Sequence, residues 1–299
     1  MFALDCRARG RHNSRMNAIA VITGTTHGIG VVTSRELARA GFTVVMLCRD
    51  VAAASRVAAD IRTQVPQAEL HCVRCDLASL ASVRESAATV RRDYGAIKLL
   101  INNAGMVSSW HRRSVDGYEL TFATNHLGPF LLTELLRDRM VEEGGRIINL
   151  ASRAHYKGRL NLAAVADPKA RYDAQAAYAQ SKLANVMHTF ALARRVSAAG
   201  SRVTVNCLHP GVVRTNLLPA WLRVIKPLIS PNIIDVERGA LTTLHLALSP
   251  DVASVTGRYY DEFQQEQRAL ALAYDLAGQE ALWESSERWV NAESRSRPQ

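Results

Sequence analysis

The sequence is poor in lysine, in aromatic residues and in long apolar runs. Only five of its 37 basic residues are lysines, so arginine accounts for most of the formal net charge of +10. The arginines are dispersed and no expected helix carries a dense basic stripe, which argues against a nucleic-acid binder. No run of about 18 uninterrupted apolar residues occurs, so we expect no membrane-spanning helix. Residues 1–16 lack the apolar core of a signal peptide; we expect them to be a disordered extension, with Met16 as an alternative start.

Cysteine is scarce as well. The five cysteines are odd in number and have no framework spacing, which is typical of a reducing compartment, so we expect a cytoplasmic protein. Cys72 and Cys75 form a C-x-x-C pair, but positions i and i+3 of a strand face opposite sides of a sheet. We therefore expect neither a disulfide nor a metal site at this pair.

Strand and helix patterns alternate from residue 17 to residue 290 without a break in composition. Such alternation predicts a single α/β domain with a doubly wound parallel sheet of the Rossmann type. Residues 291–299 are polar and are expected to form a disordered tail. The expected strands are 18–23, 43–48, 69–74, 97–101, 145–151, 202–208 and 257–260, and the expected helices are 29–40, 50–64, 79–93, 117–140, 174–199 and 235–248.

A glycine-rich turn of the form T-G-x-x-x-G-x-G occupies residues 23–30. It follows the apolar run 18–22 and precedes the helix-like stretch 31–40. In that context, free backbone N–H groups and the positive end of the helix face a bound pyrophosphate. The spacing differs from the commoner G-x-G-x-x-G fingerprint of dinucleotide-binding proteins. The turn predicts a phosphate cradle.

Tyr178 and Lys182 are four residues apart, which places the phenol and the ammonium on one face of a helix. A neighbouring ammonium favours phenolate and lowers the pKa of the tyrosine, which would make it a usable acid or base near neutral pH. A chance pair is the alternative. The order of glycine turn and then Tyr-x-x-x-Lys favours an enzyme that transfers a hydride with a nicotinamide and a proton with a tyrosine.

These two motifs resemble those of the short-chain dehydrogenase/reductase family, and the likeness spans roughly residues 17–285. The family's other motifs follow in order: the run Asn102-Asn103-Ala104-Gly105, then Asn125, Ser152 and the segment 209–215. The gap of 26 residues between Ser152 and Tyr178 is similar to the retinol-dehydrogenase-type branch. Runs 151–155, 177–185, 192–195, 208–213 and 257–260 resemble that branch too. Many of its members begin with a membrane anchor, whereas residues 1–16 here are polar and arginine-rich.

The resemblance implies four catalytic residues. Tyr178 would be the acid or base, and Ser152 would hold the substrate oxygen. Lys182 would also bond the nicotinamide ribose, and Asn125 would hold a water that links Lys182 to solvent. The simpler alternatives are a strand-capping serine, a surface lysine and a helix-kinking amide.

The expected cofactor contacts are spread over six segments. Asp76 and Leu77 would lie at the adenine, and Thr215 at the carboxamide. The complete expected set is Gly24, Thr25, Gly28, Ile29, Gly30, Arg49, Asp76, Leu77, Asn103, Ala104, Gly105, Tyr178, Lys182, Pro210, Gly211, Val213 and Thr215.

The end of the second strand bears on the choice of cofactor. An acid there would accept from a ribose 2′-OH, but the residues are Cys48 and Arg49, and a guanidinium pairs well with phosphate. Asp50 is expected to be the N-cap of the next helix. We therefore expect NADP(H), with NAD(H) as the alternative.

Residues 217–229, around Trp221, are strongly apolar. They either pack on the core or form a lid that favours a lipophilic carbonyl or alcohol, with peripheral contact to a membrane surface. The expected partner is a small-molecule substrate, and a homo-oligomer stays open. The expected function is an NADP(H)-dependent oxidoreductase that interconverts an alcohol and its aldehyde or ketone. The rival function is an NADP-binding regulatory or scaffold protein without turnover.

Overall fold

The computed structural model describes residues 18–213 and 233–292 and contains one large sheet. The strand order is β10-β9-β6-β5-β4-β1-β2-β3, and all neighbours are parallel except β9 and β10. The predicted N-terminal extension, the apolar segment 217–229 and most of the predicted tail lie outside the described residues. The strands are β1 (Ile19–Thr23), β2 (Thr43–Cys48), β3 (Leu70–Arg74), β4 (Ile97–Asn102), β5 (Arg146–Leu150), β6 (Thr204–Leu208), β9 (Tyr259–Tyr260) and β10 (Glu266–Gln267).

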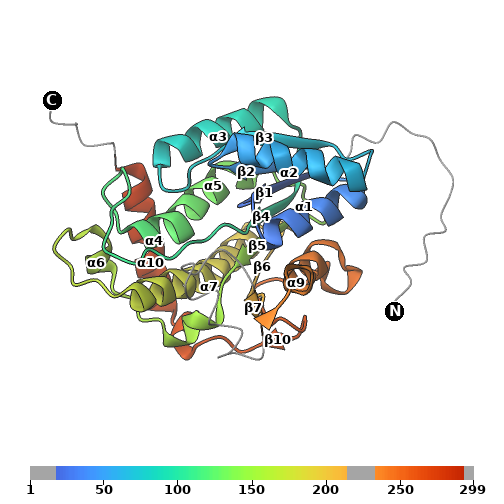
Figure 1. The fold of residues 1–299 in the computed structure, drawn as a ribbon. Coiled ribbons are helices and arrows are strands. Elements are labelled where there is room, and N and C mark those ends of the chain that lie inside the picture. The colour runs from blue at the N-terminus through green and yellow to red at the C-terminus, as the bar shows by residue number, and fades with distance from the viewer. Residues whose placement is uncertain (1–17, 214–232, 293–299) are drawn as a thin grey trace.

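Helices cover both faces of this sheet (Figure 1). Side chains alternate along each strand, so Val45 and Leu47 of β2 enter one apolar cluster and Val44 and Met46 enter the other. The predicted doubly wound α/β fold is confirmed. On one face lie α1 (Ile29–Arg39), α2 (Val51–Gln64) and α9 (Val236–Leu248); on the other lie α3 (Leu80–Asp93), α5 (Gly128–Leu136) and α7 (Ala174–Ala198).

β1 lies between β2 and β4. Strands β2 and β3 follow on one side of β1, and β4, β5 and β6 follow on the other, so the strand order reverses at β1. In an open α/β sheet a ligand binds at such a switch point, outside the carboxyl ends of the strands. The glycine-rich turn leaves β1 at this point. Asp50 caps α2, as predicted, by accepting from the backbone N of Ala53 at 2.9 Å.

Several elements differ from the sequence-based expectation. The long helix expected over 117–140 is divided into α4 (Leu120–Phe122), a π-helical turn (Ala123–Leu127) and α5. The helix α10 (Leu276–Asn291) was not expected, and its last residue lies in the predicted tail. Short elements were also missed: the 3₁₀ turn Arg153–Lys157, α6 (Leu162–Ala166) and the parallel pair β7 (Val212–Val213) and β8 (Ile233–Ile234).

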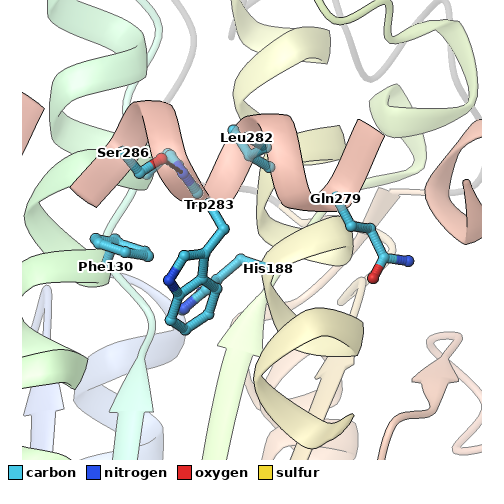
Figure 2. Close-up of a pocket in the computed structure, with 7 residues that line it drawn as sticks. Phe130, His188, Gln279, Leu282, Trp283 and Ser286 are labelled. Atoms are coloured by element: carbon cyan, nitrogen blue, oxygen red, sulfur yellow. Dashed lines mark hydrogen bonds between the residues drawn. The ribbon is translucent and has the colours of Figure 1, made fainter. Parts of the chain in front are cut away.

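Helix α10 packs across α5 and α7 and covers two buried histidines. Figure 2 shows Trp283 of α10 beside Phe130 and His188. The centroid of the Trp283 ring lies 5.1 Å from that of Phe130 and 5.6 Å from that of His188. Nε2 of His126 lies 2.9 Å from Oγ of Ser286, whereas Nε2 of His188 has no hydrogen-bond partner among the described residues. Both imidazoles are neutral near pH 7, because burial disfavours their charged forms.

We expect acid to destabilise the protein through these histidines. Burial lowers the pKa of His126 to about 4 and lowers that of His188 well below 6.5. Below pH 6.5 the unfolded chain therefore binds protons that the native chain refuses, and the free energy of unfolding falls by about 1.4 kcal/mol per pH unit for each histidine. His188→Phe should make the slope between pH 6 and pH 4.5 shallower, as measured by urea unfolding.

The matched control is His71→Gln, because His71 is exposed. That variant should keep the wild-type slope. An unchanged slope in His188→Phe would show that His188 is charged in the native protein or remains buried after unfolding.

Candidate active site

The glycine-rich turn needs glycine at particular positions. Gly24 and Gly28 have positive φ angles of 72° and 62°, which side-chain-bearing residues rarely adopt. A Cβ at Gly30 would lie 2.1 Å from the carbonyl oxygen of Gly24, so α1 can start against the turn only without a side chain there. Ile29 is the first residue of α1 and is buried. The backbone of the turn therefore passes close to the helix start.

The loop after β4 is tied to this turn. Oγ1 of Thr23 accepts from the backbone N of Asn103 and of Ala104, both at 3.0 Å. Nδ2 of Asn103 donates to the carbonyl oxygens of Thr23 at 2.8 Å and Gly24 at 2.9 Å. A Cβ on Gly24 would lie 2.8 Å from Cα of Ala104. The two loops therefore form one rigid floor at the carboxyl ends of β1 and β4.

Lys182 lies inside the protein on α7, one turn after Tyr178. Its side chain is 3% exposed, and Nζ donates to the carbonyl oxygen of Leu150 at 2.9 Å. Burial lowers its pKa to about 8. A Cβ on Gly105 would lie 3.2 Å from Nζ, so the bare backbone of Gly105 leaves room at the ammonium. The ammonium is thus buried yet adjacent to the loop that follows β4.

Tyr178 and Ser152 meet at the end of β5. Their side chains are hydrogen-bonded to each other, and Oγ of Ser152 also accepts from the backbone N of Ala154 at 3.2 Å. Burial raises the pKa of Tyr178, and the Ser152 hydrogen bond offsets only part of this rise. The prediction that Lys182 lowers this pKa is wrong for this geometry. Nζ lies 5.8 Å from the ring centroid and bonds Leu150 instead.

Asn125 lies in the π-helical turn, a distortion that is frequent at functional sites. Its Oδ1 accepts from the backbone N of Met106 at 2.7 Å, and its Nδ2 donates to the Met106 carbonyl at 2.9 Å and to Oγ of Ser181 at 3.0 Å. The amide therefore joins the loop after β4 to the residue before Lys182. The role of Asn125 in holding a water stays a prediction.

The end of β2 carries an exposed cation, as expected. Arg49 follows Cys48, and Cys48 is in register with Arg74 of β3. Arg74 is exposed at the same edge and was missed from sequence, because only the strand register brings the two segments together. Oδ1 of Asp76 accepts from the backbone N of Ala78 at 3.0 Å, and Leu77 is buried.

The segment after β6 contains the remaining expected cofactor contacts. Gly211 has a φ angle of 78°, Val213 belongs to β7, and Pro210 is partly buried. Thr215 lies outside the described residues. The carboxyl ends of β1, β4, β5 and β6 thus meet at one edge of the sheet, together with the four expected catalytic residues.

Two observations test whether these residues fit a dinucleotide. Oγ1 of Thr25 is buried and has no partner among the described residues, so the turn offers an unused polar group. The backbone around Gly24 and Gly30 is too close for side chains, as a cradle for a pyrophosphate requires. The site fits a dinucleotide, with a basic edge at Arg49 and Arg74.

Two further features lie outside the site. Cys72 and Cys75 are both free thiols, and the four described cysteines carry no disulfide. No helix within residues 18–213 and 233–292 is long and apolar enough to cross a bilayer.

Comparison with known proteins gives consistent matches. The profile of the short chain dehydrogenase family matches residues 18–223. The chain is 38% identical over 285 residues to human retinol dehydrogenase 13, covering 92% of this chain and 85% of that protein. The crystal structure of a putative uncharacterized protein from Mycobacterium paratuberculosis superposes with a TM-score of 0.76 and 32% identity, covering 93% of this chain and 95% of that one. A blue fluorescent protein from a metagenomic library, solved with NADPH, gives a TM-score of 0.64 and 26% identity, covering 82% and 96% of the two chains.

Proposed function

Because this chain belongs to the short-chain dehydrogenase family and is a retinol-dehydrogenase-like, NAD(P)-dependent oxidoreductase acting on CH–OH groups, we propose that it uses NADP(H) on a lipophilic alcohol or carbonyl. The observation that carries this proposal is the cluster of Ser152, Tyr178 and Lys182 beside the glycine-rich floor. We further propose a cytoplasmic location, which the free thiols support.

Each residue of the cluster has a separate task. The bound nicotinamide would supply or accept the hydride. Tyr178 keeps its phenolic proton at neutral pH, since its pKa is raised, and gives that proton to the substrate oxygen during reduction. Ser152 holds the same oxygen by a hydrogen bond. Lys182 faces the site from inside and places a positive charge below pH 8 next to the proton donor.

The cofactor would be held by the rigid floor and by the basic edge. Thr25, Gly28 and Ile29 would hold the pyrophosphate at the helix start, and the loop from Asn103 to Gly105 would line the opposite side of the cofactor. Arg49 and Arg74 are exposed where the paired strands β2 and β3 end, and they support a preference for the 2′-phosphate, because a guanidinium pairs well with phosphate. The NADPH bound to the metagenomic protein supports this choice by analogy.

The lipophilic substrate class rests on the name of the human relative and on the apolar sequence 217–229. A screen of NADPH consumption over retinal, medium-chain aldehydes, steroids and quinones tests the proposal. Turnover of hydrophilic carbonyls alone would contradict the lipophilic assignment. Binding of NADPH without turnover of any carbonyl or alcohol would favour the alternative, a regulatory or scaffold protein.

Arg49→Ala should erase much of the preference for NADPH over NADH. Loss of one charge-assisted hydrogen bond changes the ratio of the two kcat/KM values on the order of 10- to 100-fold. The efficiency with NADH should change little, because that cofactor lacks the phosphate. Steady-state kinetics with both cofactors measure this ratio.

Arg202→Ala is the matched control, since this exposed arginine precedes β6, away from the carboxyl ends of the strands, where it pairs with Glu143. It should keep the wild-type ratio. A wild-type preference for NADH, or an equal loss with both cofactors in Arg49→Ala, would rule out the phosphate contact.

A further inference from the structure

His209 opens the segment 209–211 and has a partner at each ring nitrogen. Nε2 lies 2.7 Å from Oε2 of Glu262, and Nδ1 lies 2.8 Å from the hydroxyl oxygen of Tyr259. A neutral imidazole with its proton on Nε2 satisfies both contacts, because Nε2–H donates to the carboxylate and Nδ1 accepts from the hydroxyl. Burial lowers the pKa of His209 and so favours this neutral form, while the Glu262 charge opposes the shift.

Glu262 is held in place by the turn between β9 and β10. The carboxylate of the preceding residue, Asp261, accepts from the backbone N of Phe263 at 2.8 Å and of Gln265 at 3.0 Å. It also accepts from Nε2 of Gln267 at 2.8 Å. The turn is thereby closed on itself, and Glu262 extends from a fixed backbone.

Glu262 also packs against Gly211. A Cβ on Gly211 would lie 3.1 Å from Cβ of Glu262. At the other end of the segment, the backbone N of His209 donates to the Tyr260 carbonyl at 3.0 Å. One carboxylic side chain therefore touches both ends of 209–211 and fixes them to the β9–β10 hairpin.

We propose that Glu262 is a positioning residue that acts through His209 and Gly211 to hold segment 209–211 against the cofactor. The proposal rests on the proposed function, in which this segment lines the nicotinamide site. Glu262 itself does not touch the reacting groups. Removing it loosens a wall of the binding site, so cofactor affinity falls while turnover at saturating cofactor is largely retained.

Glu262→Ala should raise the Kd for NADPH about tenfold, as measured by NADPH fluorescence titration, which corresponds to the loss of about one hydrogen bond. The value of kcat at saturating NADPH should change by less than about threefold. Glu262→Gln should recover most of the affinity, since its amide oxygen still accepts from Nε2–H of His209. Glu266→Ala is the matched control on the same hairpin, because Glu266 pairs outward with Arg258, and it should bind NADPH as wild type does.

The pH dependence separates positioning from a packing role. The groups that face His209 are Glu262 and Asp261 of the hairpin, Tyr259 of β9, and Arg153 and His155 of the 3₁₀ turn. Protonation of His209 occupies Nδ1, which then no longer accepts from the Tyr259 hydroxyl, so the segment loses one of its contacts at low pH. The Glu262 charge favours protonated His209. Glu262→Gln should therefore shift the acid limb of NADPH affinity to lower pH, whereas a packing defect would leave the limb in place.

Failure of wild type to bind NADPH or NADH would overturn the proposed function itself. Wild-type binding combined with equal affinity in Glu262→Ala would overturn only the positioning role. An acid limb of NADPH affinity that does not move in Glu262→Gln would also overturn the positioning role. If Glu262→Ala does not fold, the pH profile of Glu262→Gln alone tests that role.

Discussion

Tyr178→Phe should abolish turnover while the affinity for NADPH stays nearly unchanged. The variant removes one hydroxyl and leaves the ring, so only the transferable proton and its bond to Ser152 are lost. A general acid contributes on the order of 10²- to 10⁴-fold to the rate. The measurements are kcat with a substrate from the screen and Kd by NADPH fluorescence.

Tyr94→Phe provides the control, because this tyrosine lies at the end of α3, before β4 begins. It should retain wild-type kcat. Near-native kcat in Tyr178→Phe would mean that another group donates the proton, and the mechanism would be wrong.

Lys182→Ala should lower turnover and also weaken NADPH binding, whereas Tyr178→Phe should lower turnover alone. The variant removes a buried ammonium next to the proton donor and one expected contact to the ribose. We expect kcat to fall on the order of 10²-fold and the KM for NADPH to rise about tenfold. Lys98→Ala is the control, since Nζ of Lys98 bonds the Glu143 carbonyl at the amino end of β4.

Lys182→Arg gives a pH test of the same residue. The pKa of Lys182 is lowered to about 8, so the native ammonium loses its proton as the pH rises through that value. A guanidinium keeps its proton well beyond pH 8. Any residual activity of Lys182→Arg should therefore persist to higher pH than in wild type. An unchanged alkaline limb together with an unchanged KM for NADPH would count against the role of Lys182.

The fold was largely predictable because strand and helix periods are local properties of the chain. Helix α10 was missed because Gln279, Ser285 and Ser286 are buried in it, so polar residues interrupt the apolar stripe that marks an amphipathic helix. The division of the helix expected over 117–140 also escaped prediction. Its π-helical turn is accompanied by contacts between Asn125 and a distant loop.

Site residues that lie within one short motif, such as Tyr178 and Lys182, could be predicted from the sequence. Site residues could not be predicted where distant segments meet, as for Arg74 beside Arg49 or Glu262 beside His209. The predicted direction of the Tyr178 pKa shift was wrong, because the shift is dominated by burial of the phenol. Spacing along a helix gives no measure of how far a side chain is removed from water.

Helix α10 also has a consequence for how the chain folds during synthesis. Among the described elements it is the last to leave the ribosome, yet it covers His188 and Phe130 on helices made much earlier. Until it docks, these helices expose an apolar surface that is prone to aggregation. Closure of this face therefore requires residues 276–291, and a chain that terminates before them would leave apolar side chains of α5 and α7 exposed to solvent.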